Sequence, residues 1–540
     1  MADSHPIAND SPKISSLATG GDAPNDAGNG VKVSSKDQRE ALPDEPKCVI
    51  CGRYGEYICD QTDDDVCSME CKQSILSRIA KSSSSVGGPP LPVKLPAADE
   101  CFYVRDTDFK SGASSSGGNR AELLRKKLDI RVNRDVAEPV STFASCNLHE
   151  KLLHNMEAAG YDKPTPVQMQ AIPIALKGTN LLVLADTGSG KTDSFLIPIV
   201  SECGIQRLLY DPNKKKPLAI VLSPTRELCI QIEEHAKAMG KSLPFKTALV
   251  VGGDAMPGQV HRIQQGVELI VATPGRLIDL LTKHEIDLDD VKTLVVDEVD
   301  CMLQRGFRDQ VLQIYQALSQ PQVLMFTATI TSDIEKMANS LAKDIAVVTV
   351  GNPNCPNKAV KQIAIWVDSK QKKSKLFEIM RSEQHFKPPV VIYVGSRIGA
   401  DLLADTIKVV IGIKAVSIHG EKPMKERREI MQSFAAGEVT VIVATGVLGR
   451  GVDLLGVRQV IVFDMPNSID EYVHMIGRAS RMGEEGQAIV FVNSSNKKVF
   501  CELIGVLKSA GAPIPRELLN SHYTAAFVSG SKCSKKRTHK

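Results

Sequence analysis

Short apolar runs rich in β-branched residues alternate with amphipathic helical patterns along most of this chain, from about residue 140 to residue 521. Such alternation is typical of a parallel sheet flanked by helices, because parallel strands need crossover connections that cover both faces of the sheet. The predicted strands fall into two sets. The first set is Leu181–Ala185, Leu218–Leu222, Thr247–Val251, Leu269–Ala272, Thr293–Val296 and Val323–Phe326. The second set is Ile363–Val367, Val390–Val394, Ala415–Ile418, Thr440–Ala444, Gln459–Phe463 and Ala488–Val492.

A stretch rich in Gly, Pro and Asn at Val350–Asn357 separates the two sets of predicted strands. Residues of this kind interrupt both strands and helices, so the stretch predicts a linker. We therefore expect two α/β domains of similar architecture, at residues 140–351 and 352–521. A chain of 540 residues is long enough for both domains and for a smaller third unit.

The rest of the chain differs in composition from these domains. Residues 1–42 are rich in Ser, Asp, Asn and Gly, which predicts a disordered tail. Five cysteines crowd into residues 43–80 and predict a small module. Residues 81–139 predict a linker with one short charged helix at Arg120–Val132, and residues 522–540 predict a basic tail.

Charge and hydropathy limit the partners of the chain. The formal net charge is +3, with 42% hydrophobic and 24% charged residues, which is typical of soluble globular proteins. Any nucleic acid must therefore be bound by local basic groups rather than by a global positive field. No apolar run reaches the roughly 18 residues that span a bilayer, and the N-terminal stretch lacks a signal-peptide pattern. We expect a soluble, intracellular protein without a membrane partner, and we favour the nucleus over the cytoplasm.

Residues 185–192, with the sequence ADTGSGKT, follow a predicted buried strand and open a predicted helix. A phosphate-binding loop requires this context, because its glycines let backbone N–H groups turn toward phosphate oxygens. Lys191 would reach the β- and γ-phosphates, and the Thr192 hydroxyl would ligate Mg²⁺. The alternative is a Gly-rich turn that binds no ligand, and the complete string disfavours it.

Three carboxylates, Asp297, Glu298 and Asp300, follow another predicted apolar strand. They would lie at the carboxyl edge of the sheet, where open α/β folds bind ligands. An acidic turn at a strand end is common by itself, but a phosphate loop on the same sheet favours a catalytic role. Asp297 would then hold Mg²⁺, and Glu298 would orient and deprotonate the attacking water.

From Phe143 to Leu519 these motifs stand in the order found in DEAD-box RNA helicases, and the chain resembles that family. The resemblance includes a Q motif at residues 160–168 (GYDKPTPVQ). It implies two tandem RecA-like domains, each a parallel sheet flanked by helices, and RNA-stimulated hydrolysis of ATP. Gln168 would read the adenine edge and Phe143 or Tyr161 would stack on the base, so we expect a preference for ATP over GTP.

The resemblance also implies roles for further residues in both domains. Those that would bind ATP and Mg²⁺ are Phe143, Tyr161, Gln168, Ala185, Asp186, Thr187, Gly188, Ser189, Gly190, Lys191, Thr192, Asp297 and Asp453. Those that would contact RNA are Pro224, Thr225, Arg226, Gly253, Thr273, Pro274, Gly275, Arg276, Arg427 and Thr445. Those that would couple the domains are Asp300, Thr327, Thr329 and His474. The catalytic set would be Lys191, Asp297, Glu298, Arg478 and Arg481.

Arg478 and Arg481 lie three residues apart in a predicted helix, in the motif HMIGRASR. By the resemblance they would act as arginine fingers on the γ-phosphate. The phosphate loop belongs to one domain and the fingers to the other, so hydrolysis should require the domains to close. If closure also assembles the RNA groove, ATP and RNA should bind cooperatively.

Four cysteines of the small module, Cys48, Cys51, Cys67 and Cys71, have the spacing of a tetrahedral zinc site. The module resembles a HIT-type zinc finger, which commonly interleaves two sites, but here Cys59 lacks the partners of a second set. We therefore expect one Zn²⁺ and a protein partner for the finger. Buried cysteines without metal are the alternative, which the small core of the segment disfavours.

Three functions remain open at this point. The first is an RNA-stimulated ATPase that remodels RNA duplexes or ribonucleoprotein. The second is an ATP-gated RNA clamp, favoured by departures from the family motifs at Met424, Met475 and Ser480. The third is a DNA helicase, which the Q motif together with the DEVD turn disfavours. We expect RNA as a partner and a monomeric chain.

Overall fold

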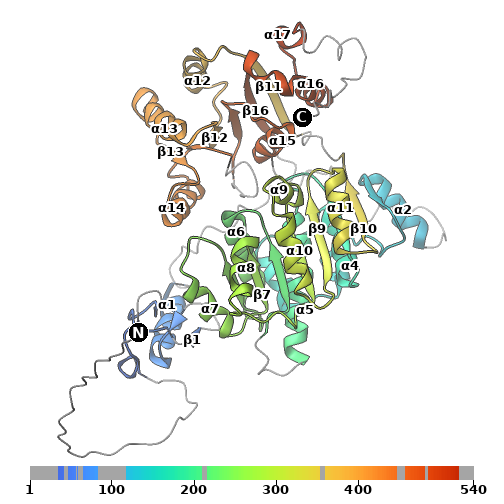
Figure 1. The fold of residues 1–540 in the computed structure, drawn as a ribbon, viewed down its shortest axis with the longest axis vertical. Coiled ribbons are helices and arrows are strands. Elements are labelled where there is room, and N and C mark those ends of the chain that lie inside the picture. The colour runs from blue at the N-terminus through green and yellow to red at the C-terminus, as the bar shows by residue number, and fades with distance from the viewer. Residues whose placement is uncertain are drawn as a thin grey trace, which may run out of the picture.

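Two α/β domains lie next to each other, and a small cysteine-rich unit lies beside the first of them (Figure 1). The computed structural model describes residues 34–41, 47–55, 57–58, 65–82, 117–209, 216–352, 359–446, 456–480 and 485–521. Of the predicted disordered tail at 1–42, residues 1–33 and 42 fall outside these residues, whereas 34–41 are described and include the short helix Ser35–Asp37. The predicted tail at 522–540 and most of the predicted linker at 350–357 also fall outside the described residues. Among the described helices, none is both long and apolar enough to cross a bilayer.

The described part of the first domain forms an eight-stranded sheet with helices on both faces. Its strands, in spatial order, are β3 (Ile130–Val132), β10 (Ala346–Val350), β4 (Leu181–Leu184), β9 (Gln322–Thr327), β8 (Thr293–Val296), β5 (Ala219–Leu222), β7 (Leu269–Ala272) and β6 (Thr247–Val250). Its helices are α2 (Gly117–Lys127), η3 (Phe143–Cys146), α3 (Glu150–Ala158), α4 (Pro166–Leu176), α5 (Lys191–Leu209), α6 (Arg226–Met239), α7 (Met256–Gln264), α8 (Pro274–Thr282), α9 (Val299–Gln304), α10 (Arg308–Gln316) and α11 (Ser332–Leu341). All neighbouring strands are parallel except β3 and β10.

The described part of the second domain forms a six-stranded, fully parallel sheet. Its strands, in spatial order, are β11 (Val360–Trp366), β16 (Gly486–Val492), β15 (Gln459–Val462), β12 (Val390–Tyr393), β14 (Val441–Ala444) and β13 (Ala415–Ile418). Its helices are α12 (Lys372–Arg381), α13 (Arg397–Ile411), α14 (Met424–Ala435), α15 (Ile469–Ile476), η4 (Gly477–Ala479), η5 (Ser494–Val499), α16 (Phe500–Ser509) and α17 (Arg516–Leu519). The two tandem parallel-sheet domains confirm the predicted fold class.

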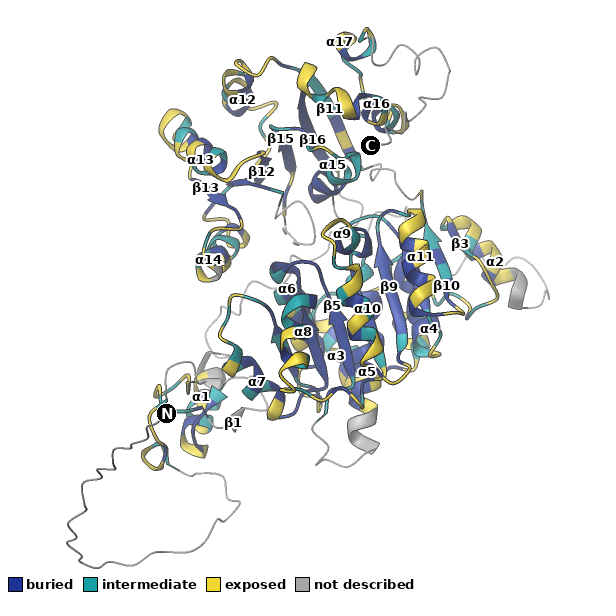
Figure 2. Cartoon of the chain, viewed as in Figure 1, coloured by how far each residue is buried: buried dark blue, intermediate teal, exposed yellow. Residues whose placement is uncertain are grey.

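The central strands are buried on both faces, which explains their continuous apolar sequences. In β4, alternate side chains enter different cores: Leu181 packs on the side of Phe195 and Phe326, while Leu182 packs on the opposite side. Figure 2 shows the same division, with dark blue strands between helices whose outer faces are yellow. Each fully buried side chain of this size contributes roughly 1.5–3 kcal/mol to folding.

The carboxyl ends of β4, β5, β7 and β8 meet at one edge of the first sheet, because these strands are parallel. The turns that leave this edge contain the phosphate loop, the PTREL and TPGR motifs and the acidic turn. Helices begin directly after each turn, and the N-cap threonines Thr225 of α6 and Thr273 of α8 stand at this edge. The topology therefore gathers the predicted motifs in one place.

The structure corrects the helix predicted at Arg120–Val132. Helix α2 ends at Lys127, Asp129 has a φ angle of 51°, and β3 then pairs antiparallel with β10. The guanidinium of Arg125 donates to the side chain of Gln170 at 2.8 Å, which ties α2 to α4. This part of the predicted linker therefore packs as an edge of the first domain.

The cysteine-rich unit contains η1 (Ser35–Asp37), β1 (Tyr57–Ile58), β2 (Asp65–Val66) and α1 (Met69–Ser82). Its strands pair antiparallel, and its small core consists of Cys48, Val66, Cys67, Cys71 and Ile75. So few apolar residues cannot offset the conformational entropy of the segment, which is why a metal or another tether is needed.

Candidate functional site

The loop at residues 185–190 joins β4 to the first turn of α5. Gly188 and Gly190 have φ angles of 77° and 89°, a region that residues with a Cβ rarely adopt. A Cβ on Gly190 would also lie 2.6 Å from Nε2 of Gln168. The glycine therefore permits both the turn and the close approach of the Q motif.

Lys191 lies folded over this loop. Its Nζ donates hydrogen bonds to the carbonyl oxygens of Ala185, at 2.6 Å, and Asp186, at 2.8 Å. Burial lowers the pKa of Lys191, opposed by the negative charges of Asp297 and Glu298. A buried ammonium at a helix N-terminus, with backbone carbonyls as its hydrogen-bond partners, has strong affinity for an incoming anion.

The acidic turn begins at the carboxyl end of β8. Asp297 is only 3% exposed, and its Oδ1 accepts the backbone N–H of Glu298 at 2.9 Å. Burial and the neighbouring charge of Glu298 raise the pKa of Asp297 to about 7, against the attraction of Lys191. Glu298 has a φ angle of 49°, a strained backbone for a non-glycine residue. A buried carboxylate, Asp297, next to a partly buried one, Glu298, fits a divalent cation, which would relieve their mutual repulsion.

Both the oxygen and the nitrogen of the Gln168 side-chain amide, near the start of α4, have hydrogen-bond partners. Its Oε1 accepts the backbone N–H of Thr165 at 2.9 Å, and its Nε2 lies 3.4 Å from both the Gly190 carbonyl and Oδ2 of Asp193. Because the N–H of Thr165 can only donate, it fixes which amide atom is the oxygen. The Oε1 atom keeps one acceptor position for a ligand, whereas both hydrogens of Nε2 already point toward the Gly190 and Asp193 oxygens.

The two aromatic candidates of the Q motif have different surroundings. Phe143 is 5% exposed and packs in the first core. The Tyr161 hydroxyl donates to Oδ1 of Asp193 at 3.1 Å, and burial together with the Asp193 charge raises the pKa of Tyr161. Asp193 was not singled out in the sequence, where it looks like an ordinary polar residue in a first helical turn.

Asp300 connects three motifs. Its Oδ2 accepts the Thr329 hydroxyl at 3.0 Å, and the Thr327 hydroxyl donates to the carbonyl oxygen of Thr329 at 2.8 Å. From the second domain, Nε2 of His474 lies 3.0 Å from the same Oδ2. Burial would raise the pKa of Asp300, but the charge and hydrogen bond of His474 hold it below its usual range. The four predicted coupling residues therefore meet at one point between the domains.

Arg478 follows one turn after His474. Its Nη2 lies 3.8 Å from Oε1 of Glu298, and within the described residues its Nε and Nη2 have no hydrogen-bond partner. Gly477 sits so close to the phosphate loop that any Cβ there would overlap the Thr187 side chain. Arg478 is thus a buried cation that faces the acidic turn with unused donors. Arg481 and Asp453 lie outside the described residues.

The predicted RNA-contacting residues of the first domain share the edge described above. The Thr225 hydroxyl caps α6, and the guanidinium of Arg226 rests against Gly252. Arg276, in the first turn of α8, donates to the carbonyl oxygen of Asp254 at 3.0 Å. The remaining members of this group on the edge are Pro224, Gly253, Thr273, Pro274 and Gly275.

The structure places two basic residues of α14 against the first domain. Arg427 is 5% exposed and forms a buried ion pair with Glu227, so in this arrangement it faces the domain interface rather than an open groove. Arg428 pairs with Asp254 at 3.1 Å. Thr445, at the end of β14, is also buried. Neither Glu227 nor Asp254 had been selected from the sequence.

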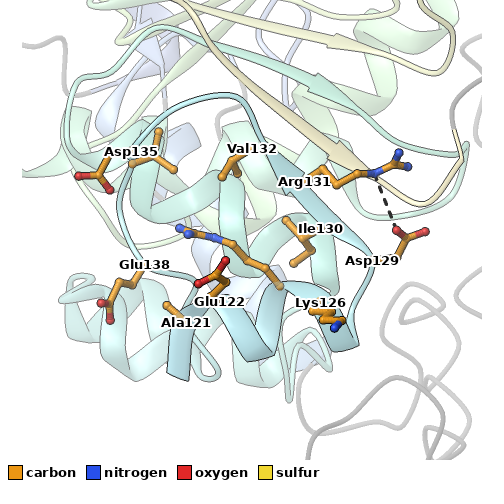
Figure 3. A pocket seen from close by; sticks show the side chains of 11 residues that line it. Ala121, Glu122, Lys126, Asp129, Ile130, Arg131, Val132, Asp135 and Glu138 are labelled. Carbon is orange, nitrogen blue, oxygen red and sulfur yellow. Dashed lines mark ion pairs between the residues drawn. The ribbon is translucent and has the colours of Figure 1, made fainter. Parts of the chain in front are cut away.

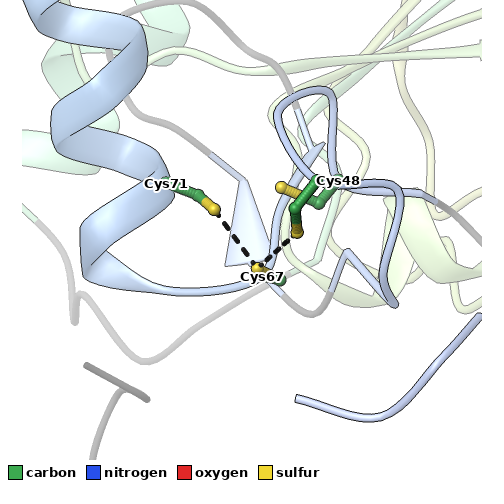
Figure 4. Close-up of side chains that lie close together, drawn as sticks. Cys48, Cys67 and Cys71 are labelled. Atoms are coloured by element: carbon green, nitrogen blue, oxygen red, sulfur yellow. Dashed lines mark hydrogen bonds between the residues drawn. The ribbon is translucent and has the colours of Figure 1, made fainter. Parts of the chain in front are cut away.

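The four candidate zinc ligands form one cluster (Figure 4). Their sulfur atoms all lie within 4.8 Å of one another. The Sγ of Cys67 lies 3.3 Å from that of Cys51 and 3.5 Å from that of Cys71. Four thiols gathered from two loops and a helix are the donor set of a structural zinc site.

A hollow of about 550 Å³ lies away from these motifs, between α2 and β3 (Figure 3). Its walls mix cations such as Arg125 with carboxylates such as Glu122 and Asp135. Asp129 and Arg131 pair with each other across one side. Because opposite charges alternate around it, the hollow shows no preference for a ligand of either sign.

Comparison with known proteins decides the family. The DEAD/DEAH box helicase family matches residues 165–337, the helicase conserved C-terminal domain matches 371–483, and the HIT zinc finger matches 44–73. DEAD-box ATP-dependent RNA helicase 41 of Arabidopsis thaliana is 64% identical over 91% of this chain and 94% of its own length. The chain belongs to the DEAD-box ATP-dependent RNA helicases.

More distant members of the DEAD-box family agree with this assignment. The probable ATP-dependent RNA helicase DDX59 of Homo sapiens is 44% identical over 91% of this chain and 79% of its own length. The solved structure of Dbp5 from S. cerevisiae, bound to RNA and ADP BeF3, has 27% identity and a TM-score of 0.60 over 69% of this chain and 95% of that one. This DEAD-box helicase is therefore an RNA-stimulated ATPase that remodels RNA, with an N-terminal HIT zinc finger.

Proposed function

We propose that this helicase hydrolyses ATP in a site that is complete only when the second domain closes on the first. The observation that carries the proposal is the buried contact of His474 with Asp300, which joins the acidic turn to α15, and α15 continues directly into η4 and Arg478. Because the contact is buried and hydrogen-bonded, it favours one relative position of the domains. In that position the guanidinium of Arg478 lies 3.8 Å from the carboxylate of Glu298.

Lys191 and Thr192 begin α5 and are proposed to hold the phosphates. An ATP phosphate would replace the carbonyls of Ala185 and Asp186 as the partner of the Lys191 ammonium. Asp297 and the Thr192 hydroxyl would hold Mg²⁺, which neutralises charge on the β- and γ-phosphates when bound. The raised pKa of Asp297, caused by burial and by Glu298, supports a cation at this point.

Glu298 is proposed to orient the attacking water and take its proton, while the water oxygen bonds to the γ-phosphorus and the bond to the bridging oxygen breaks. Arg478 would donate its unused N–H groups to the γ-phosphate. Arg481 as a second finger and Asp453 as a ribose contact rest on the family motifs alone.

Base recognition is proposed to depend on Gln168, supported by Asp193. With its amide orientation fixed by Thr165, Gln168 offers a free acceptor position on Oε1, and its Nε2 would turn one hydrogen to the base in place of a 3.4 Å contact with Gly190 or Asp193. Adenine presents a donor at N6 and an acceptor at N7, which match both positions. Guanine presents an acceptor at O6 instead of the donor, so GTP is disfavoured. Phe143 or Tyr161 would pack on the base.

RNA is proposed to lie along the first-domain edge formed by Thr225, Arg226, Gly253 and the TPGR turn. Hydroxyl groups, backbone N–H groups and arginines at strand ends suit contacts with phosphates, which do not depend on base sequence. Thr445 would contribute from the second domain, and Arg427 would do so only on leaving its buried ion pair with Glu227. From the sequence we also propose a monomeric chain located in the nucleus and a protein partner for the finger.

Replacing the proposed general base tests the mechanism directly. Glu298→Gln should keep ATP binding and slow hydrolysis by about 100-fold or more, because the proton acceptor is lost while the shape is kept. The protein should then remain on RNA after ATP addition, measured by filter binding alongside phosphate release. Glu335→Gln, an exposed change on α11, is the matched control. Native hydrolysis by Glu298→Gln would contradict the assignment.

Nucleotide preference tests the base contact. Gln168→Ala should lower the ratio of kcat/KM for ATP over GTP by roughly 10-fold or more, because a hydrogen-bonding site rejects the wrong base most strongly. Asp193→Ala should lower the same ratio less, since it only loosens the amide. Asp162→Ala, an exposed carboxylate next to Tyr161, should leave the ratio unchanged. An unchanged ratio in Gln168→Ala would contradict the proposal.

Metal analysis tests the finger. We propose that Cys48, Cys51, Cys67 and Cys71 bind one Zn²⁺ per chain, and in comparable peptides such binding supplies on the order of 10 kcal/mol of folding free energy. Native mass spectrometry should find one zinc, which Cys67→Ser removes and Cys59→Ser keeps. Two zincs per chain would overturn the single site.

A further inference from the structure

The zinc finger touches the helicase domain through one aromatic residue. The Tyr54 ring meets the His261 ring of α7 edge-on, with centroids 5.6 Å apart and planes at 60°. The Tyr54 hydroxyl lies 3.4 Å from Nδ1 of His261. Figure 1 shows the same approach, with α1 and β1 of the finger beside α7. Edge-to-face geometry with a polar contact is a favourable arrangement for two such rings.

The loop that contains Cys48 and Cys51 positions Tyr54. The backbone N–H of Cys48 donates to the carbonyl oxygen of Arg53 at 2.8 Å, so the loop that holds two zinc ligands also holds the residue before Tyr54. On the other side, the guanidinium of Arg39 lies 4.0 Å from the Tyr54 ring centroid. The Tyr54 N–H donates to the Arg39 carbonyl oxygen at 3.1 Å. Tyr54 is therefore presented by a folded finger and not by a free chain.

Helix α7 lines a hollow at the contact with Tyr54. Together with Tyr54, residues Met256, Val260, His261 and Lys283 line a hollow of about 420 Å³. Within the described residues, Nε2 of His261 is buried without a hydrogen-bond partner. Tyr54 of the finger closes one side of this hollow, which also contains the apolar side chains of Met256 and Val260.

The same helix begins at the RNA edge and the domain interface. Asp254 lies two residues before α7 and pairs with Arg428 of the second domain at 3.1 Å. The helix is anchored to the residue that follows β6, because Gln259 donates to the Val251 carbonyl oxygen at 2.9 Å. A shift of α7 at His261 is therefore passed to Asp254, because the nine-residue helix is short and only Ala255 separates Asp254 from its first residue.

We propose that α7 is the docking site of the chain's own zinc finger, and that docking and closure of the two domains on RNA favour each other. The linkage follows from one continuous segment, residues 254–264, in which His261 contacts the finger and Asp254 pairs with Arg428. The contact is small, but the finger is tethered through residues 83–116, so its effective concentration at α7 is on the order of mM. The RNA part of the inference rests on the proposed RNA edge, whereas the docking itself does not.

Hydrogen exchange in the full-length protein tests the docking from both sides. In Tyr54→Ala, amides of residues 256–264 should exchange about threefold faster or more, because α7 loses its cover. Tyr54→Phe keeps the ring and should change exchange less. Zinc content is measured in parallel, since Tyr54 is not a candidate ligand and the metal should remain. Unchanged exchange in α7 with zinc still bound would overturn the docking.

A substitution on α7, His261→Ala, tests the same docking without altering the fold of the zinc finger. His261→Ala should speed exchange at residues 47–55 of the finger, while His154→Ala, an exposed histidine on α3, should not. RNA with a non-hydrolysable ATP analogue should slow exchange at 47–55 in the wild-type chain and have no effect there in His261→Ala. If RNA binds but exchange at 47–55 does not respond, docking stands and its coupling to closure is wrong. If RNA does not bind, the proposed RNA edge is wrong.

Discussion

The contact on which the rest of this structure depends is the buried pair formed by Asp300 and His474. Both side chains are almost fully removed from solvent, and Thr329 shares the Asp300 carboxylate. Leaving either partner of such a pair alone in the interior costs about 3–5 kcal/mol. The domains are thus held in the one relative position in which both groups have their partners.

This arrangement divides the chemistry between two domains. The first domain presents Lys191 and the carboxylates Asp297 and Glu298 at the end of its sheet, and the second presents Arg478 from the end of α15 and η4. The absence of a side chain at Gly477 lets the second domain reach the phosphate loop. In the described residues the charges proposed to surround the γ-phosphate come from both domains, which supports the proposal that hydrolysis is linked to closure and, through it, to RNA.

The sequence predicted those parts of the fold that depend on residues close together in the chain. The core strands stand out because they are continuous apolar runs, and the phosphate loop because its glycines and Lys191 lie together in the chain. Strand β3 could not be predicted from the sequence. It has only three residues, two of them apolar, directly after a charged helix, and it pairs with a strand more than 200 residues away.

Side-chain partners across the fold were the least predictable part of the site. Asp193 looks like an ordinary first-turn residue until α4 brings Gln168 to it. Arg427 was expected to contact RNA, and only the packing of α14 against α6 pairs it with Glu227. The contact of Tyr54 with His261 joins segments with no shared sequence pattern.

The central claim, that the Asp300–His474 contact assembles the catalytic site, is tested most directly by a double-mutant cycle on RNA-stimulated ATP turnover. Asp300→Asn, His474→Gln and the double variant are compared with the wild-type chain. The account predicts that each single change lowers turnover by roughly 10-fold or more and that the double variant is little worse than either, because one shared contact is lost. Effects that multiply in the double variant would contradict it.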